Sequence, residues 1–207
     1  MLGTNRKFEQ LAHHNMFFSD DYESEFDAIF KDGRPAGDPS IYVCATSRTD
    51  PSQAPEGCEN LFILVNAPYT SDAFDWDAVT RGHGEGGTRG RGDAETRGGG
   101  DGESGFSFKE KYGDLVIDKL ETFGLEGLRE SIVYRDSITP EDFETRYRAN
   151  RGSIYGISSN GILSAFMRVP NMAKDIGNLF FVGGTTHPGG GMPLVLLSGK
   201  MAAELIG

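Results

Sequence analysis

Short apolar runs separated by polar, turn-forming residues predict a small sheet in the first third of the chain. Residues 11–18, 41–46 and 61–66 have the length of strands, and the third run is apolar at almost every position. Their spacing, with one helical stretch inserted, favours an antiparallel or mixed sheet. Because side chains alternate along a strand, His13 and His14 are expected on opposite faces. The inward-facing one is interpreted either as a buried, hydrogen-bonded histidine or as a residue near a substrate.

Helices are predicted at three places, two of which carry local start signals. Acidic and N-cap residues at 19–23 begin a helix that runs to about Phe30. Apolar spacing predicts a second helix over 106–123, and a strand is expected over 131–138. Thr139 as N-cap, followed by proline and an acid at the third position, begins another helix. The first helix is expected to bury its large apolar side chains, Tyr22, Phe26, Ile29 and Phe30.

The last thirty residues combine an apolar run, a glycine-rich turn and a small-residue helix. Leu179–Val182 is predicted to be a buried strand that ends at Gly183 and Gly184. Pro193 suits the first turn of a helix, where its missing N–H is harmless. Residues 194–206 are then expected to form a buried helix.

A strand, a glycine loop and a helix start suit an anionic or electron-rich ligand. Free N–H groups at a helix N-terminus point at such a ligand, and the helix dipole favours negative charge there. Gly189, Gly190 and Gly191 carry no Cβ, so a flat ring can lie against their backbone. The alternative is a tight turn without any ligand, and the pattern alone leaves both interpretations open.

Residues 81–105 differ in composition from the rest of the chain. Glycine, arginine and acidic residues dominate, and no apolar residue larger than alanine occurs. Such a segment cannot offset its ordering entropy by burial, so it is predicted to be a disordered insertion. Its arginines are balanced by acids, which argues against nucleic-acid binding.

The overall charge is strongly acidic, with a formal net charge of −11 over 207 residues. Most of this charge lies outside the glycine-rich segment, so it is expected on the folded surface. A protein kept soluble in concentrated salt has this character, and an ordinary acidic protein is the alternative. The acidity also argues against simple electrostatic docking on anionic lipid.

Two cysteines, four histidines and no C-x-x-C motif predict neither a disulfide framework nor a metal site. No run approaches the roughly 20 apolar residues that span a bilayer. The chain start lacks the pattern of a signal peptide. The expected location is therefore the cytoplasm, with a peripheral contact on the inner face of the membrane as an addition. No serine–histidine–aspartate set, Walker loop or paired-carboxylate site is recognisable.

Four stretches carry a more specific pattern when they are taken together and in order. The most characteristic is Val-Gly-Gly-Thr-Thr-His-Pro-Gly-Gly-Gly-Met-Pro, beginning at Val182 and followed by Leu-Ser-Gly-Lys. The other three are Leu11–Ser19, Tyr42–Ser52 with Ala54–Gly57, and Thr139–Tyr147 with Arg151–Ser153. In this order they resemble the C-terminal portion of phytoene desaturases of the bacterial, archaeal and fungal type, which are FAD-dependent carotenoid oxidoreductases with an amine-oxidase-like fold.

The resemblance implies an α/β (α+β) fold from which the N-terminal Rossmann βαβ unit is missing. It implies FAD as cofactor, a carotenoid or isoprenoid substrate, and a partner that carries the missing N-terminal FAD-binding half. The chain is then divided into four segments. They are a substrate-domain sheet (1–80), the insertion (81–105), a helical substrate-domain segment (106–175) and the strand–loop–helix of the FAD domain (176–207).

Site residues follow from the same resemblance, and no catalytic residue is identified. Arg48, Asp50 and His187 are candidates for the substrate site, with a structural ion pair or cap as the alternative for the first two. Related scaffolds also oxygenate, isomerise or saturate carotenoids, and a non-catalytic remnant is a further alternative. The expected cofactor contacts are Gly183, Gly184, Gly190, Gly191, Met192 and Pro193.

Overall fold

The computed structural model describes residues 1–78, 107–154 and 168–207. Within these residues the chain forms two compact units, an N-terminal unit (Met1–Asp142) and a C-terminal unit (Phe143–Gly207). The predicted insertion at 81–105 lies outside the described residues. The boundary between the units, at Asp142 and Phe143, falls inside the segment 106–175 that was expected to be one helical part of the substrate domain.

The N-terminal unit is built on a five-stranded sheet with the order β2-β3-β4-β1-β5. Every pairing in this sheet is antiparallel. The structure therefore confirms a mixed α/β fold with an antiparallel sheet, while the amine-oxidase-like architecture stays a prediction. The strands are β1 (Leu2–Thr4), β2 (His14–Phe17), β3 (Ile41–Cys44), β4 (Glu59–Val65) and β5 (Ile132–Arg135).

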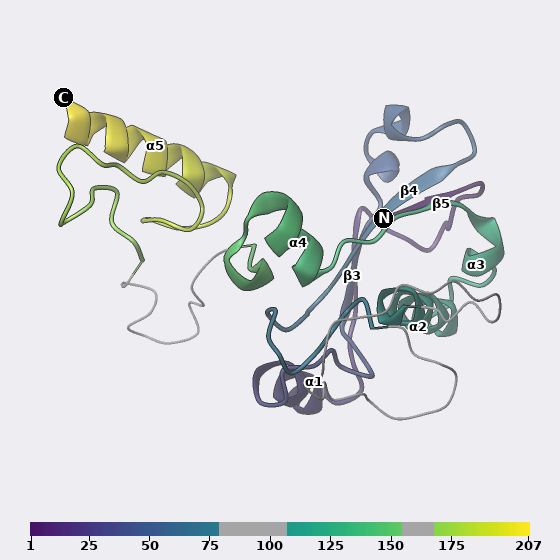
Figure 1. The fold of residues 1–207 in the computed structure, drawn as a ribbon. Coiled ribbons are helices and arrows are strands. Elements are labelled where there is room, and N and C mark those ends of the chain that lie inside the picture. The colour runs from purple at the N-terminus through teal and green to yellow at the C-terminus, as the bar shows by residue number, and fades with distance from the viewer. Residues whose placement is uncertain (79–106, 155–167) are drawn as a thin grey trace, which may run out of the picture. The chain divides into compact units, whose positions relative to one another are not determined.

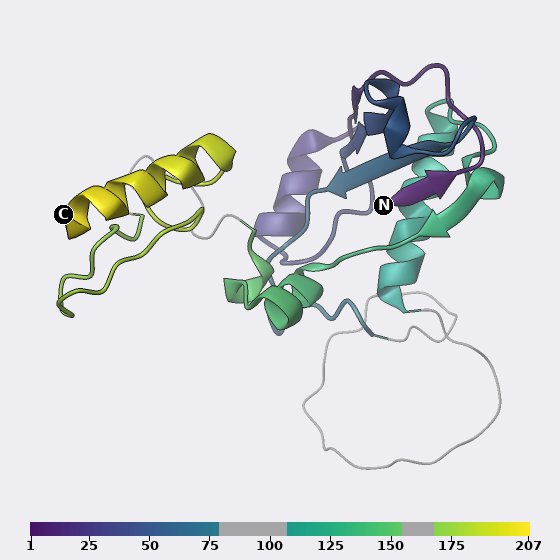
Figure 2. The same ribbon diagram turned by 90° about the horizontal axis from the view of Figure 1, so that it is seen from above.

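One face of the sheet packs against α2 (Phe108–Thr122), which Figures 1 and 2 show alongside the strands. The strand side chains on this face form a buried core with the helix. They are Ile41, Val43 and Leu61, which pack with Val116 and Leu120 of α2. The apolar positions of the helix recur every three to four residues and those of the strands every two, so both faces meet in one core. A buried leucine here contributes about 2–5 kcal/mol relative to alanine.

Local capping fixes where α2 and α4 (Pro140–Tyr147) begin; the cap of α4 was predicted from the sequence, whereas that of α2 was not. Ser107 and Glu110 form a capping box at α2, with Ser107 N–H donating to Glu110 Oε2 at 2.9 Å. Thr139 and Asp142 bond reciprocally at α4, at 2.9 and 3.3 Å. Both boxes satisfy N–H groups that the first helical turn leaves free.

The first predicted strand is shorter than expected, and its histidines are arranged differently. A bend occupies His13, and β2 begins only at His14. The prediction that the two histidines face opposite sides is wrong, because the bend brings their rings to 4.3 Å between centroids.

The first helix, α1 (Tyr22–Phe30), begins at the predicted place but buries less than expected. Asp21 is its N-cap and accepts from Ser24 N–H at 3.0 Å, and Ile29 is buried. Tyr22 and Phe30 are exposed, contrary to the prediction. Ala28 and Ile29 are the buried apolar residues of the helix, whereas Tyr22, Phe26 and Phe30 pack on one another along it. Shorter helices complete the units: α3 (Leu128–Ser131) and the 3₁₀ turns Thr46–Arg48, Pro51–Gln53 and Asn150–Gly152.

The C-terminal unit is organised around α5 (Met192–Ile206). The predicted buried strand at Leu179–Val182 is wrong: only Phe180 forms an isolated bridge, to Met172, and Val182 is exposed. The expected burial of the helix is wrong as well, because Leu196 is 76% exposed and only Ser198 and Ala202 are buried. Among the described residues of this unit, the segments that pack on α5 cover only the side that carries Ser198 and Ala202. No helix among the described ranges has the length and apolarity to cross a membrane.

Candidate functional site

The face of the sheet that points away from α2 carries apolar side chains exposed to solvent. Strand register places His14, Cys44 and Phe62 in one cross-strand row and Met16, Tyr42 and Leu64 in the next. Phe62 and Leu64 are 44% and 43% exposed. We call these two rows the open face. Contiguous exposed apolar side chains on one face are characteristic of surfaces that bind an apolar ligand or partner.

A polar cluster occupies one end of the open face. His13 Nδ1 lies 2.5 Å from Thr49 Oγ1, and His14 Nδ1 lies 2.7 Å from the Tyr42 hydroxyl. One nitrogen of each ring and Sγ of Cys44 all lie within 4.8 Å of one another. The interaction with Cys44, together with burial, raises the pKa of the Tyr42 phenol above its ordinary value. The cluster is therefore a set of mutually interacting groups that can donate, accept or ligate.

Sequence reasoning missed this cluster because its members come from separate segments. His14 and Cys44 are direct partners across β2 and β3, a pairing that depends on strand register. A signal was nevertheless present: two polar, ligand-forming residue types stood in adjacent predicted strands. His13 joins the cluster because of the bend at this residue, and the sequence did not predict that bend.

Arg48 and Asp50, two of the substrate-site candidates, have structural partners within the N-terminal unit. Arg48 Nε donates to the buried carboxylate of Glu59 at 2.6 Å, and its Nη1 pairs with Glu9 at 3.1 Å. The Asp50 side chain accepts from Ser52 N–H at 3.1 Å and caps a 3₁₀ turn. That hydrogen bonding lowers the pKa of Asp50. These contacts favour the ion-pair and cap alternatives, and a substrate role for either residue stays a prediction.

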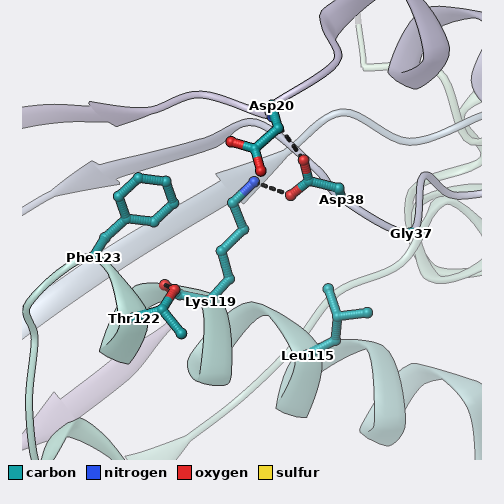
Figure 3. Close-up of a pocket in the computed structure, with 7 residues that line it drawn as sticks. All are labelled: Asp20, Gly37, Asp38, Leu115, Lys119, Thr122 and Phe123. Carbon is teal, nitrogen blue, oxygen red and sulfur yellow. Dashed lines mark hydrogen bonds and ion pairs between the residues drawn. The ribbon is translucent and has the colours of Figure 1, made fainter.

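A hollow of about 230 Å³ lies between α2 and the loop that contains Gly37 and Asp38 (Figure 3). Lys119 pairs with Asp38 across it and donates to Pro39 C=O at 2.9 Å. Asp20 N–H donates to Asp38 at 2.7 Å. The hydrogen bond from Lys119 holds the pKa of Asp38 below its ordinary value. Because these polar groups already satisfy one another, the hollow is a structural junction. The remaining lining residues are Leu115, Thr122 and Phe123.

The glycine turn that precedes α5 is held by a buried network centred on Ser198. Its hydroxyl receives Asn171 Nδ2–H at 2.9 Å and Gly183 N–H at 3.3 Å, and lies 3.0 Å from Thr186 Oγ1. Ser198 is fully buried. A buried hydroxyl with several partners fixes backbone position, so this network sets the path of the turn over the helix.

Backbone geometry explains why glycine recurs in this turn. Gly183 has φ 129° and Gly191 has φ 97°, which are backbone angles that residues with a side chain rarely adopt. A Cβ added at either position would meet open space. At Gly184 a Cβ would lie 3.5 Å from the Cα of Gly190. Met192 is 83% exposed at the first helical position. The turn thus presents bare backbone and a helix N-terminus, which suit an electron-rich ligand edge.

The structure also shows where the remaining predicted site residues lie. His187 is exposed in the same turn and donates its backbone N–H to Val169 C=O at 2.9 Å. Gly190 and Pro193 complete the predicted cofactor set, and all six of its members belong to this one turn and helix start. Their contact with a cofactor stays a prediction.

Comparison with known proteins gives matches along almost the whole chain. A 4,4'-diapolycopene oxygenase of Methylomonas sp is 38% identical over 205 residues, covering 99% of this chain and 36% of the relative. A 4,4'-diaponeurosporene oxygenase of Staphylococcus haemolyticus is 37% identical over 205 residues, and one of Staphylococcus aureus is 36% identical over 207 residues. The chain spans about a third of the length of these curated relatives. No family model matches the chain.

These relatives correct one prediction made from the sequence. The interpretation of the chain as the C-terminal portion of a phytoene desaturase is wrong, because the matching relatives are named as oxygenases. The quoted motifs contain β2, most of β3 with the turns that follow it, α4 and the glycine turn. Such elements position a ligand without specifying which reaction follows, and fold-level likeness does not identify a reaction.

Proposed function

We propose that this protein acts as a carotenoid-modifying oxidoreductase of the oxygenase kind, on a linear carotenoid such as those named for its relatives. The observation that carries the proposal is the similarity along 99% of the chain to a 4,4'-diapolycopene oxygenase. Oxygenation was one of the alternative reactions that the sequence analysis left open, beside isomerisation and saturation. It takes precedence because the names of the relatives agree on oxygenation while differing in the carotenoid.

The open face supports a long apolar substrate. A carotenoid is a polyene hydrocarbon with little to hydrogen-bond, so its binding depends on burial of apolar area. Phe62 and Leu64 on β4 and Met16 on β2 offer that area on either side of β3. At about 25 cal/mol per Å², covering even a few hundred Å² of this face contributes several kcal/mol before the cost of association. We propose that the polyene lies along these rows.

FAD is the proposed cofactor, and the turn before α5 fits its flat ring system. Gly183 and Gly191 leave open space beside the backbone, and the exposed start of α5 offers free N–H groups. When bound, FAD supplies the electron-transfer and oxygen chemistry that amino-acid side chains lack. The residues that would hold it are Gly183, Gly184, Gly190, Gly191, Met192 and Pro193.

In this proposal, the residues of the turn before α5 position the cofactor ring and polarise the edge of it that faces the helix. Ser198, Asn171 and Thr186 fix the turn through buried hydrogen bonds, so little reorganisation is needed when a ligand arrives. The N-terminus of α5 favours negative charge at the ligand edge that it faces. Positioned dipoles of this kind stabilise charge that develops during a reaction.

The test is conversion of a named substrate by the purified protein. The chain is incubated with 4,4'-diapolycopene in detergent, FAD, a reductant and isotopically labelled O₂, and the products are analysed by mass spectrometry. We expect a product that carries the label and that depends on FAD. Unlabelled dehydrogenated products, or unchanged carotenoid despite demonstrated binding, would overturn the oxygenase proposal.

A pair of variants at Met192 tests the cofactor seat in the same preparation. Met192→Glu places a carboxylate at a helix start, where it favours the helix but repels an electron-rich ring edge. Met192→Gln has nearly the same size without the charge. We expect FAD affinity to fall about tenfold, about 1.4 kcal/mol, for glutamate only. Equal affinity in both variants would remove the start of α5 from the flavin site.

A further inference from the structure

Two histidines and a cysteine converge at one end of the open face. His13, His14 and Cys44 each offer one ligand atom, and these atoms lie within 4.8 Å of one another. We propose that they bind a single divalent transition-metal ion of the zinc class, with a fourth coordination position left for water or another ligand. This proposal does not rest on the proposed function.

The ligand set suits such an ion chemically. Imidazole nitrogen and thiolate sulfur are the ligands that Zn²⁺ and Co²⁺ prefer, and three protein ligands with one open position form a recurrent arrangement. Metal–ligand distances of about 2.0–2.3 Å place ligand atoms ~3.5 Å apart in a tetrahedron. The cluster therefore closes around an ion by side-chain movements of about an ångström, without any change in strand register.

Hydrogen bonds orient both rings as they do in known metal sites. His13 uses one ring nitrogen toward Thr49 Oγ1 at 2.5 Å, and His14 uses one toward the Tyr42 hydroxyl at 2.7 Å. Ligating histidines usually bond a neighbouring group through the nitrogen that does not hold the metal. Each ring is thereby held in place, and we expect its other nitrogen to face the ion.

The backbone holds the three residues together before any ion arrives. His14 and Cys44 are cross-strand partners, and Ala45 N–H donates to His13 C=O at 2.8 Å, which fixes the bend. Cys44 is 8% exposed, while His14 is exposed and gives an ion a path from solvent. This arrangement runs counter to the sequence prediction of no metal site. That prediction rested on motif spacing, which is blind to partners on separate strands.

The test is Co²⁺ titration of the purified chain, free of any histidine tag and reduced with a non-thiol reagent. We expect a thiolate-to-cobalt charge-transfer band in the near ultraviolet that saturates at one ion per chain and disappears when Zn²⁺ is added. Cys44→Ser should abolish the band, and His14→Ala should weaken affinity at least about tenfold. Circular dichroism checks that both variants keep their secondary structure.

Matched controls come from the chain itself. Cys58→Ser removes the other cysteine and His187→Ala removes a histidine of the C-terminal unit, and neither should change the band. A band that survives in Cys44→Ser, that is lost in Cys58→Ser, or that appears only with excess cobalt would overturn the proposal. If Cys44→Ser does not fold, X-ray absorption on wild type decides. One sulfur and two imidazole ligands support the site, and a shell without sulfur refutes it.

Discussion

At the scale of single residues, the sharpest constraint is a buried carboxylate. Glu59 is 1% exposed and accepts from Phe8 N–H at 3.1 Å and from Arg48 Nε at 2.6 Å. Arg48 also donates to Phe8 C=O. A charge this deep is tolerated only when it is paired and hydrogen-bonded. Arg48 therefore connects β4 to the loop after β1. Its place in the motif Tyr42–Ser52 did not reveal this structural role.

Removing the cation should be costly, and the cost should depend on the carboxylate. We expect Arg48→Met to lower the free energy of unfolding by about 3–5 kcal/mol, because Glu59 is left buried and unpaired. The double variant Arg48→Met/Glu59→Gln should recover much of this loss. Urea unfolding measures both. A single variant within about 1 kcal/mol of wild type would show that the pair is dispensable.

At the scale of elements, the features that the sequence predicted well depend on residues close together in the chain. The features that it missed depend on contacts between segments far apart in the chain. The start of α4 was predicted because capping depends on residues three positions apart, and α2 was predicted from its apolar spacing. The strand at Leu179–Val182 failed because an apolar run becomes a strand only with a partner, and Phe180 finds a single bridge. The sequence also did not predict that His13 lies close to Cys44, because this depends on the register between β2 and β3 and on the bend at His13.

The glycine turn provides a test of backbone geometry at this scale. Gly191 has φ 97° with open space around its Cβ position, so Gly191→Ala introduces strain without a clash. We expect a loss of about 1–3 kcal/mol in the stability of α5, measured by hydrogen exchange of its amides.

Gly177→Ala is the matched control, because its Cβ would also meet open space and its φ is not in the positive range. It should be neutral or slightly stabilising. If alanine were tolerated equally at both positions, the turn would have to adopt another conformation in solution.

At the scale of the whole molecule, an acidic chain depends on the few cations that pair with its carboxylates. In the N-terminal unit, Lys109 and Lys119 of α2 reach Asp142 and Asp38. Burial tends to raise the pKa of Asp142, but Lys109 and Thr139 outweigh it, and the net pKa is lowered. A lowered pKa means stability that is present above the unfolded value and lost as pH falls through the folded one.

Acid should therefore weaken the N-terminal unit in a defined window. We expect the free energy of unfolding to fall once pH drops below about 4, the ordinary pKa of aspartate, and to keep falling through the lowered pKa of folded Asp142. Asp142→Asn should lower stability at neutral pH and make this pH dependence shallower. Urea unfolding at a series of pH values measures the slope, and an unchanged slope in the variant would assign the acid sensitivity to other carboxylates.

The central claim is that a linear carotenoid lies on the open face, and binding tests it most directly. Leu64→Lys places a charge among Phe62, Met16 and Tyr42, whereas Val133→Lys places one at an exposed site on the edge strand β5. Neither side chain is buried, so both variants should fold. The measurement is the amount of 4,4'-diapolycopene that co-elutes with each protein on gel filtration in detergent. We predict retention by wild type and Val133→Lys and at least about a tenfold loss in Leu64→Lys, because the polyene would cover an unpaired ammonium. Equal retention by all three proteins would contradict the claim.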